Sequence, residues 1–454
     1  MSAAPASRMH RCDTTTRVTG NQQEAQSGEG LVRAIGRWSF AALTINCIIG
    51  SGVFGLPAVL AEKAGRNSVF GVLLAGVAVG VVMACFAEVA SRFTETGGPY
   101  LYAREAFGSF LGIQVAWLVW FVRLTACAAN ANLFVTYLAE FWGKASQPIP
   151  RFIVLTVLIG MLAAINLRGV RAGAGVSTAF TVAKLASLGL VGGAGATYLV
   201  SIRRMMPSLT STSGVHADSW LQAVVLLIFA YGGFETALIS AGEARDPRRD
   251  VPFGLFAALL TCTFIYGLIQ WVVVAVLPDP AHSVRPLADV ARIILGQGGA
   301  TLIAAGALFS IYGYLSGNLL ATPRITFALA ERGEFPSLFG LVHSRFRTPW
   351  FSILVFACLV WLLALLGSFT WNVTLSAGSR LFYYGLVCAA LPALRRKQGR
   401  APFRLPAGYF LAFLGVAICL GLLTRIDYSK SLVLLAAFGI ACLNWLVVRR
   451  KGNV

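Results

Sequence analysis

Apolar runs long enough to cross a lipid bilayer recur along most of this chain, and they constrain its fold more than any other feature. A helix needs about 20 predominantly apolar residues to span the hydrocarbon core. Of the 454 residues, 57% are hydrophobic and only 12% are charged, whereas a soluble domain has about 25% charged residues. We therefore predict an all-α membrane protein with twelve transmembrane helices. These lie at about 39–60, 68–92, 107–138, 150–167, 173–200, 219–240, 252–277, 298–323, 350–367, 371–394, 405–424 and 431–448.

The basic residues predict how the chain is oriented in the membrane. The net charge is +19, but these residues lie in short loops between apolar runs and not on a folded domain, so nucleic acid is not the expected partner. Lys and Arg concentrate in alternate loops and in both end segments. By the positive-inside rule, we expect a multi-pass protein of the cell (inner) membrane with both termini in the cytoplasm. Residues 1–34 are a predicted flexible cytoplasmic tail, and residues 450–454 are a predicted cytoplasmic end.

The first predicted span contains a segment that a continuous helix tolerates poorly. Residues 50–57 carry three glycines, a serine and a proline. Irregular backbone survives at membrane depth only when it is buried in protein or lines a watery cavity. A helix that restarts after a break presents free N–H groups and the positive end of its dipole, which suit a carboxylate. The alternative is a glycine-rich face for close helix packing.

A second interruption lies in the sixth predicted span. Residues 228–236 again combine apolar residues with two adjacent glycines, Gly232 and Gly233. Breaks in the first and sixth spans are expected when two five-helix halves repeat in inverted topology, because such transporters bind substrate where two discontinuous helices meet. The pair favours a transport site over a packing motif.

Several motifs together resemble those of the amino acid–polyamine–organocation transporter superfamily, over roughly residues 35–450. They are Ile49-Gly50-Ser51-Gly52-Val53-Phe54, Phe229 through Glu235, Glu95-Thr96-Gly97-Gly98-Pro99-Tyr100 with Tyr102-Ala103-Arg104 and Ala106-Phe107-Gly108, Ala321-Thr322-Pro323-Arg324 with Ala328 and Ala330-Glu331-Arg332-Gly333, and Leu381-Phe382-Tyr383-Tyr384.

This resemblance implies a LeuT-like fold of two inverted repeats, at 35–201 and 215–397, with two peripheral helices at 403–449. It also implies a substrate site around the two breaks. The backbone of Ile49, Gly50, Ser51 and Gly52 is expected to bind the α-carboxylate of an amino acid. The segment Phe229, Ala230, Tyr231, Gly232 and Gly233 is expected to offer carbonyls to the α-ammonium, with the aromatic rings of Phe229 and Tyr231 acting as a gate.

Lys184 is the one charged residue of the fifth predicted span. An ammonium there is costly unless it faces the bundle interior or a cavity. In some bacterial relatives, a lysine of the fifth helix takes the place of a coupling sodium and contacts the unwound first helix. The resemblance therefore implies proton-coupled or sodium-independent transport with Lys184 as the coupling residue. The alternative is a structural cation that ties the fifth span to backbone carbonyls.

Three further charged residues are candidates for gating or for a buried ion pair: Glu235, Arg123 and Glu88. Arginine does not readily lose its proton, so Arg123 in the third span needs a partner. We expect an ion pair with Glu235 or Glu88, and the alternative is a contact with an acidic substrate side chain. Arg380 is expected at an inner gate or in helix packing, as is Glu88. Asn130 and Asn318 are expected to pack between helices or to contact substrate.

The favoured function is therefore a secondary amino acid transporter, a symporter or antiporter, that works as a monomer or homodimer in membrane lipid. A polyamine or organic amine transporter of the same fold is the first alternative, and a transporter-like membrane sensor is the second. An enzyme is not expected, because all four histidines lie outside the predicted spans and no metal or cofactor motif is present.

Overall fold

The computed structural model describes residues 35–93, 97–169, 174–202 and 217–450, and the structural statements below concern these residues. The predicted tail (1–34), part of the Glu95–Tyr100 motif (95–96), residues 215–216 of the second predicted repeat and residues 451–454 of the predicted C-terminal end lie outside them.

Helices form almost the whole of the described chain. In order, they are α2 (Arg37–Ile48), α3 (Gly52–Ala64), η1 (Gly65–Asn67), α4 (Ser68–Ala90), α5 (Pro99–Phe107), α6 (Ser109–Leu138), α7 (Pro148–Leu167), α8 (Ala174–Ser201), α9 (Ala217–Tyr231), α10 (Phe234–Ala237), η2 (Leu238–Glu243), α11 (Pro247–Val276), α12 (Pro286–Glu331), η3 (Ser337–Gly340), α13 (Trp350–Leu366), α14 (Phe369–Gln398), α15 (Gly408–Leu423) and α16 (Tyr428–Arg450). Among these residues the only strand-like pairing is an isolated bridge between Ile35 and Ala244.

The helices have the length and composition of membrane spans. Nine helical segments of the described chain are long and apolar enough to cross a bilayer, and two shorter helices, α13 and α15, are also apolar. The prediction of an all-α membrane protein is therefore confirmed. The count of twelve spans and the inverted repeat stay predictions, because apolar length alone does not fix either one.

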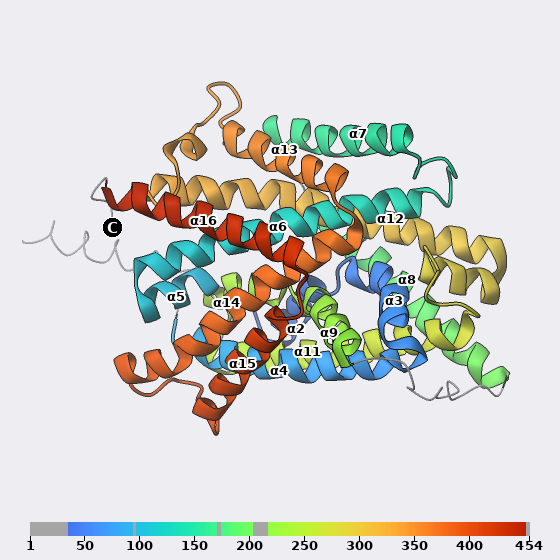
Figure 1. Ribbon diagram of the computed structural model, residues 1–454, viewed down its shortest axis with the longest axis horizontal. Helices are drawn as coiled ribbons and strands as arrows, with labels where there is room; N and C mark the ends of the chain where they lie inside the picture. The colour runs from blue at the N-terminus through green and yellow to red at the C-terminus, as the bar shows by residue number, and fades with distance from the viewer. Residues whose placement is uncertain (1–34, 94–96, 170–173, 203–216, 451–454) are drawn as a thin grey trace, which may run out of the picture.

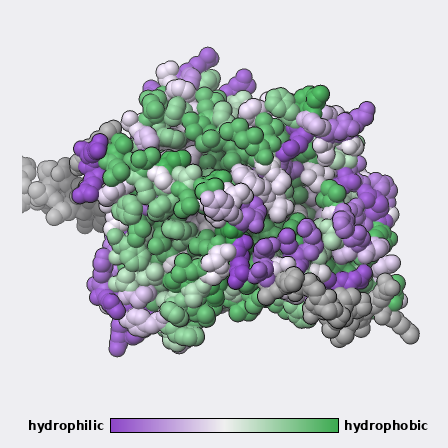
Figure 2. Space-filling model, viewed as in Figure 1, coloured by the Kyte–Doolittle hydropathy of each residue, from purple (hydrophilic) through white to green (hydrophobic). Residues whose placement is uncertain are grey.

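The outer surface agrees with a lipid environment. Large apolar side chains stand exposed on several helices, including Leu260 and Phe264 of α11, Phe413 of α15 and Leu435 of α16. Figure 2 shows apolar residues covering most of the face in view, with polar residues at its left and right ends, at its top edge and in a patch right of its centre. In water such a surface would be unfavourable, whereas lipid tails solvate it at no cost.

The two short helices that precede the chain breaks lie in the middle of the molecule. Most of the long helices run side by side along the horizontal axis of Figure 1, and α2 and α9 lie among them near the centre. Helix α2 packs on α10 and α11, and α3 packs on α9. Helices α6, α8, α12 and α14 complete the surroundings of the site described next.

Candidate functional site

The first chain break lies where the glycine pattern predicts it. Helix α2 ends at Ile48, the backbone of Ile49 is extended (φ −69°, ψ 96°), and α3 begins at Gly52. The backbone N–H groups of Gly50, Ser51 and Gly52 have no hydrogen-bond acceptor among the described residues. The buried Ser51 hydroxyl also has no partner there. This helix start therefore offers several free donors at one place, as the first turn of a helix does.

The second break separates α9 from α10 and is fixed by a buried carboxylate. Gly233 has a φ of +117°, a conformation that favours glycine. Its N–H donates to Glu235 Oε2 at 2.8 Å, so the side chain of Glu235 replaces the helical acceptor that the break removes.

The two breaks touch each other through backbone atoms. A Cβ atom placed on Gly233 would lie 2.2 Å from the carbonyl oxygen of Cys47, and one on Gly52 would lie 3.0 Å from the Cα of Ala230. Only glycine allows the chains to come this close. The predicted meeting of two interrupted helices is therefore present in the structure.

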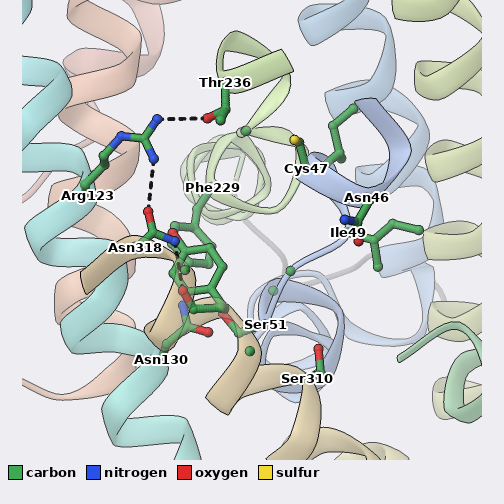
Figure 3. Close-up of a pocket in the computed structure, with 18 of the residues that line it drawn as sticks. Asn46, Cys47, Ile49, Ser51, Arg123, Asn130, Phe229, Thr236, Ser310 and Asn318 are labelled. Atoms are coloured by element: carbon green, nitrogen blue, oxygen red, sulfur yellow. Dashed lines mark hydrogen bonds between the residues drawn. The ribbon is translucent and has the colours of Figure 1, made fainter. Parts of the chain in front are cut away.

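A cavity of about 520 Å³ opens at this meeting point. It borders both breaks, from Asn46 to Gly52 and at Phe229, Ala230, Gly232 and Gly233. Helix α6 contributes Arg123 and Asn130, and α12 contributes Asn318 and Ser310 (Figure 3). Its size is in the range of small-molecule sites.

One residue predicted to bind substrate does not border the cavity. Tyr231 is fully buried and its hydroxyl donates toward Val72 O, at 3.1 Å, on α4. Its ring packs edge-on against Tyr266. Phe229 does line the cavity. Residues two positions apart on a helix point in nearly opposite directions, so Phe229 and Tyr231 cannot both face the same space. The Tyr231 side chain therefore lies away from the cavity, whereas the ring of Phe229 lies where the expected gate would be.

Lys184 reaches from α8 to the first break. Its Nζ donates to Asn46 O (3.1 Å), Asn46 Oδ1 (2.7 Å) and Ile49 O (2.6 Å). The three donors of the ammonium thus meet three uncharged oxygens, two of them main-chain carbonyls left free by the end of α2. The predicted contact with the unwound first helix is present, and it fits either a coupling or a structural role.

Glu235 and Arg380 form a buried ion pair with a distance of 3.2 Å between Arg380 Nε and Glu235 Oε1. The Tyr383 hydroxyl donates to Oε1 and the Tyr384 hydroxyl to Oε2, each at 3.0 Å. Arg380 Nη1 also donates to Phe229 O at 3.3 Å. The carboxylate accepts four hydrogen bonds from the described residues, so its two oxygens have the partners they need within the protein and its charge is balanced by Arg380.

Arg123 does not form the ion pair predicted for it. Within the described chain its hydrogen bonds go to Asn318 Oδ1 and Thr236 Oγ1, both at 3.0 Å, as Figure 3 shows. Glu235 is already occupied by Arg380, and Glu88 lies away from the cavity, where it pairs with Arg395 (2.6 Å) and Arg92 (3.3 Å). Each predicted carboxylate thus has an arginine partner from another segment.

Two residues that shape the site were not singled out by the sequence. Asn46 supplies two of the three oxygens around Lys184. Tyr266 of α11 places its hydroxyl 3.1 Å from Ile48 O and 3.0 Å from Ala230 O, one carbonyl from each broken helix. Both are polar side chains within apolar spans, which is the signal that marks functional positions in membranes. Among the described residues, no group of three or more His, Cys, Asp or Glu side chains could hold a metal ion.

Comparisons with known proteins agree with the geometry. The profile of the family described as "Amino acid permease" matches residues 35–440. The chain is 28% identical over 401 residues to the serine/threonine exchanger SteT of Bacillus subtilis, covering 86% of this chain and 90% of the relative. It is 26% identical over 430 residues to the methylthioribose transporter of the same species, with 87% and 89% covered. It is 28% identical over 339 residues to the vacuolar cationic amino acid transporter 4 of Arabidopsis thaliana, with 70% and 56% covered.

Proposed function

This chain belongs to the amino acid permease family of the amino acid–polyamine–organocation superfamily, and on that premise we propose that it moves amino acids across the cell membrane by alternating access. It is a multi-pass integral membrane protein and a transporter by family, not an enzyme. The observation that carries the proposal is the cavity at the contact of the two broken helices. At its edge lie the N–H groups of Gly50, Ser51 and Gly52, which have no acceptor within the described part of the chain.

The zwitterionic part of an amino acid fits this pair of breaks. The free N–H groups and the Ser51 hydroxyl at the start of α3 are donors for an α-carboxylate. The end of α9 supplies carbonyl oxygens for an α-ammonium. Phe229 O already accepts from Gly232 N–H and Arg380, whereas Ala230 O accepts from Tyr266 alone among the described residues. Since a carbonyl oxygen has two lone pairs, Ala230 is the better ammonium acceptor.

The wider architecture of the proposal has twelve spans. Residues 35–201 and 215–397 form two inverted five-helix repeats, 403–449 are peripheral, and both termini are cytoplasmic. Its support is the placement of the two helix breaks, α2–α3 and α9–α10, near the start of each proposed repeat and in contact with each other.

Lys184 is the proposed coupling residue, with proton-coupled or sodium-independent transport as the result. Its ammonium holds the carbonyl of Ile49 beside the proposed carboxylate site, so its protonation is coupled by geometry to the shape of that site. A lysine in apolar surroundings can release its proton, which an arginine cannot.

The test uses purified protein in liposomes offered a panel of labelled amino acids, with and without a pH gradient. We expect uptake or exchange of at least one of them. Failure with every amino acid would overturn the proposed function.

The coupling role is tested by Lys184→Ala, with Lys144→Ala in an exposed loop as the matched loss of one lysine. We expect the first variant to lose the response to the pH gradient and the second to keep it. Proton-driven uptake that persists unchanged in Lys184→Ala would contradict the coupling role.

A further inference from the structure

The cavity carries more positive than negative charge. The described residues around it include three cationic side chains, Arg123, Lys184 and Arg380, and one carboxylate, Glu235. Arg380 and Glu235 neutralise each other as an ion pair. Two cations therefore remain without an anionic partner among the described residues.

The two remaining cations differ in how their donors are used. The ammonium of Lys184 has three donors and meets three oxygens. The guanidinium of Arg123 has five N–H donors, and its hydrogen bonds within the described chain go to two neutral oxygens, on Asn318 and Thr236. Its buried Nε has no partner in the described part of the chain. Arg123 therefore retains both its charge and hydrogen-bonding capacity at the cavity wall.

Arg123 is half-buried, and an arginine charge without a counter-ion is costly within a membrane-spanning helix, so an anion that reaches it lowers that cost. Building on the proposed function, we propose that the substrate is an acidic amino acid. Its α-carboxylate binds at the start of α3, and its side-chain carboxylate binds Arg123. A planar guanidinium suits a carboxylate particularly well because it can donate two parallel hydrogen bonds.

The same charges argue against cationic substrates. A polyamine or a basic amino acid needs an acidic partner in the site. Glu235 is the one carboxylate at the cavity among the described residues, and it already accepts four hydrogen bonds, from Arg380, Tyr383, Tyr384 and Gly233. A second positive charge would add repulsion from Arg123 with no compensating contact.

The experiment compares L-glutamate with L-glutamine, which have nearly the same shape and differ in side-chain charge. Liposomes hold the same unlabelled amino acid inside and the labelled one outside, so that exchange moves no net charge. A hydrogen-bonded charge pair at Arg123 predicts that the unmodified protein exchanges glutamate roughly tenfold or more faster than glutamine at low concentration. Lysine should exchange least.

Two variants at the same position separate a substrate contact from a merely structural bridge. Arg123→Gln removes the charge and should bring the glutamate-to-glutamine ratio close to one, whereas Arg123→Lys should keep a preference for glutamate. Arg345→Gln, in an exposed loop, removes the same charge away from the cavity and should leave the ratio unchanged. A structural bridge would lower both rates together and leave their ratio as it was.

The outcomes separate this inference from the function on which it rests. Exchange of neutral amino acids at rates equal to or above that of glutamate would overturn the inference and leave the transporter intact. An unchanged ratio in Arg123→Gln would do the same. Exchange of no amino acid would overturn both. If Arg123→Gln cannot be produced as a folded protein, the glutamate-to-glutamine ratios of the unmodified protein and of Arg123→Lys still test the inference, because a ratio near one in both would overturn it.

Discussion

Replacing Gly233 with alanine tests whether the two broken helices meet as closely as described. The φ of +117° at Gly233 is outside the region that an alanine accepts without strain, which costs about 1–3 kcal/mol. The new Cβ would also lie 2.2 Å from Cys47 O, and relieving that overlap by moving packed helices costs about 1–3 kcal/mol more. The sum, about 2–6 kcal/mol, is a large part of the roughly 5–15 kcal/mol that stabilises a typical protein.

The assay is thermal unfolding of the purified protein in detergent, followed by exchange in liposomes. Gly267→Ala on α11 is the matched control, because a Cβ there meets no atom within 4 Å. We expect Gly233→Ala to unfold at a clearly lower temperature and to lose transport, and Gly267→Ala to behave as the unmodified protein does. Equal unfolding temperatures and rates for all three proteins would refute the close contact between Gly233 and the end of α2.

Two further predictions concern single contacts. Tyr266→Phe removes the hydroxyl shared by Ile48 O and Ala230 O, which should cost about 1–3 kcal/mol of stability and slow transport. Tyr428 is exposed, so Tyr428→Phe should change neither stability nor transport. Equal unfolding temperatures for the two variants would contradict the role of the Tyr266 hydroxyl. The hydrogen bond from Arg292 and the nearby charges of Arg285 and Arg292 hold the pKa of Glu140, just beyond α6, below its ordinary value. A lowered folded-state pKa gives stability that is present above the unfolded value of about 4.3 and lost as the pH falls through the folded one. The unfolding temperature should therefore drop on acidification below about pH 4, less steeply in Glu140→Gln, and parallel pH profiles would count against this ion pair.

Local chemistry made the breaks predictable, because glycine acts on the backbone at its own position, whereas Pro57 lies inside α3 and interrupts no helix. Residues 49–52 and 232–233 interrupt their helices as the sequence indicates. The helical class likewise follows from apolar run lengths.

The sequence does not show which charged residues pair across helices, because pairing depends on how helices that are distant in sequence are rotated against one another. Arg123 and Arg380 both lie within predicted spans, and nothing local shows that Arg380, 145 positions from Glu235, is the one that pairs with it. Helical geometry alone separates the direction of the Tyr231 side chain from that of Phe229, so the placement of only one of the two rings at the cavity follows from their spacing. Asn46 and Tyr266 were visible as polar residues in apolar spans, but their contacts join segments far apart in sequence.

The position of Tyr266 bears on how the protein moves. Its hydroxyl has a single proton and lies within hydrogen-bonding distance of one carbonyl from each interrupted helix. Rotation of the hydroxyl alone, with the ring fixed, can therefore switch the hydrogen bond from one carbonyl to the other. The ends of α2 and α9 are thereby coupled to one fixed point on α11. A change that opens the cavity must either carry these two ends along with α11 or break this contact.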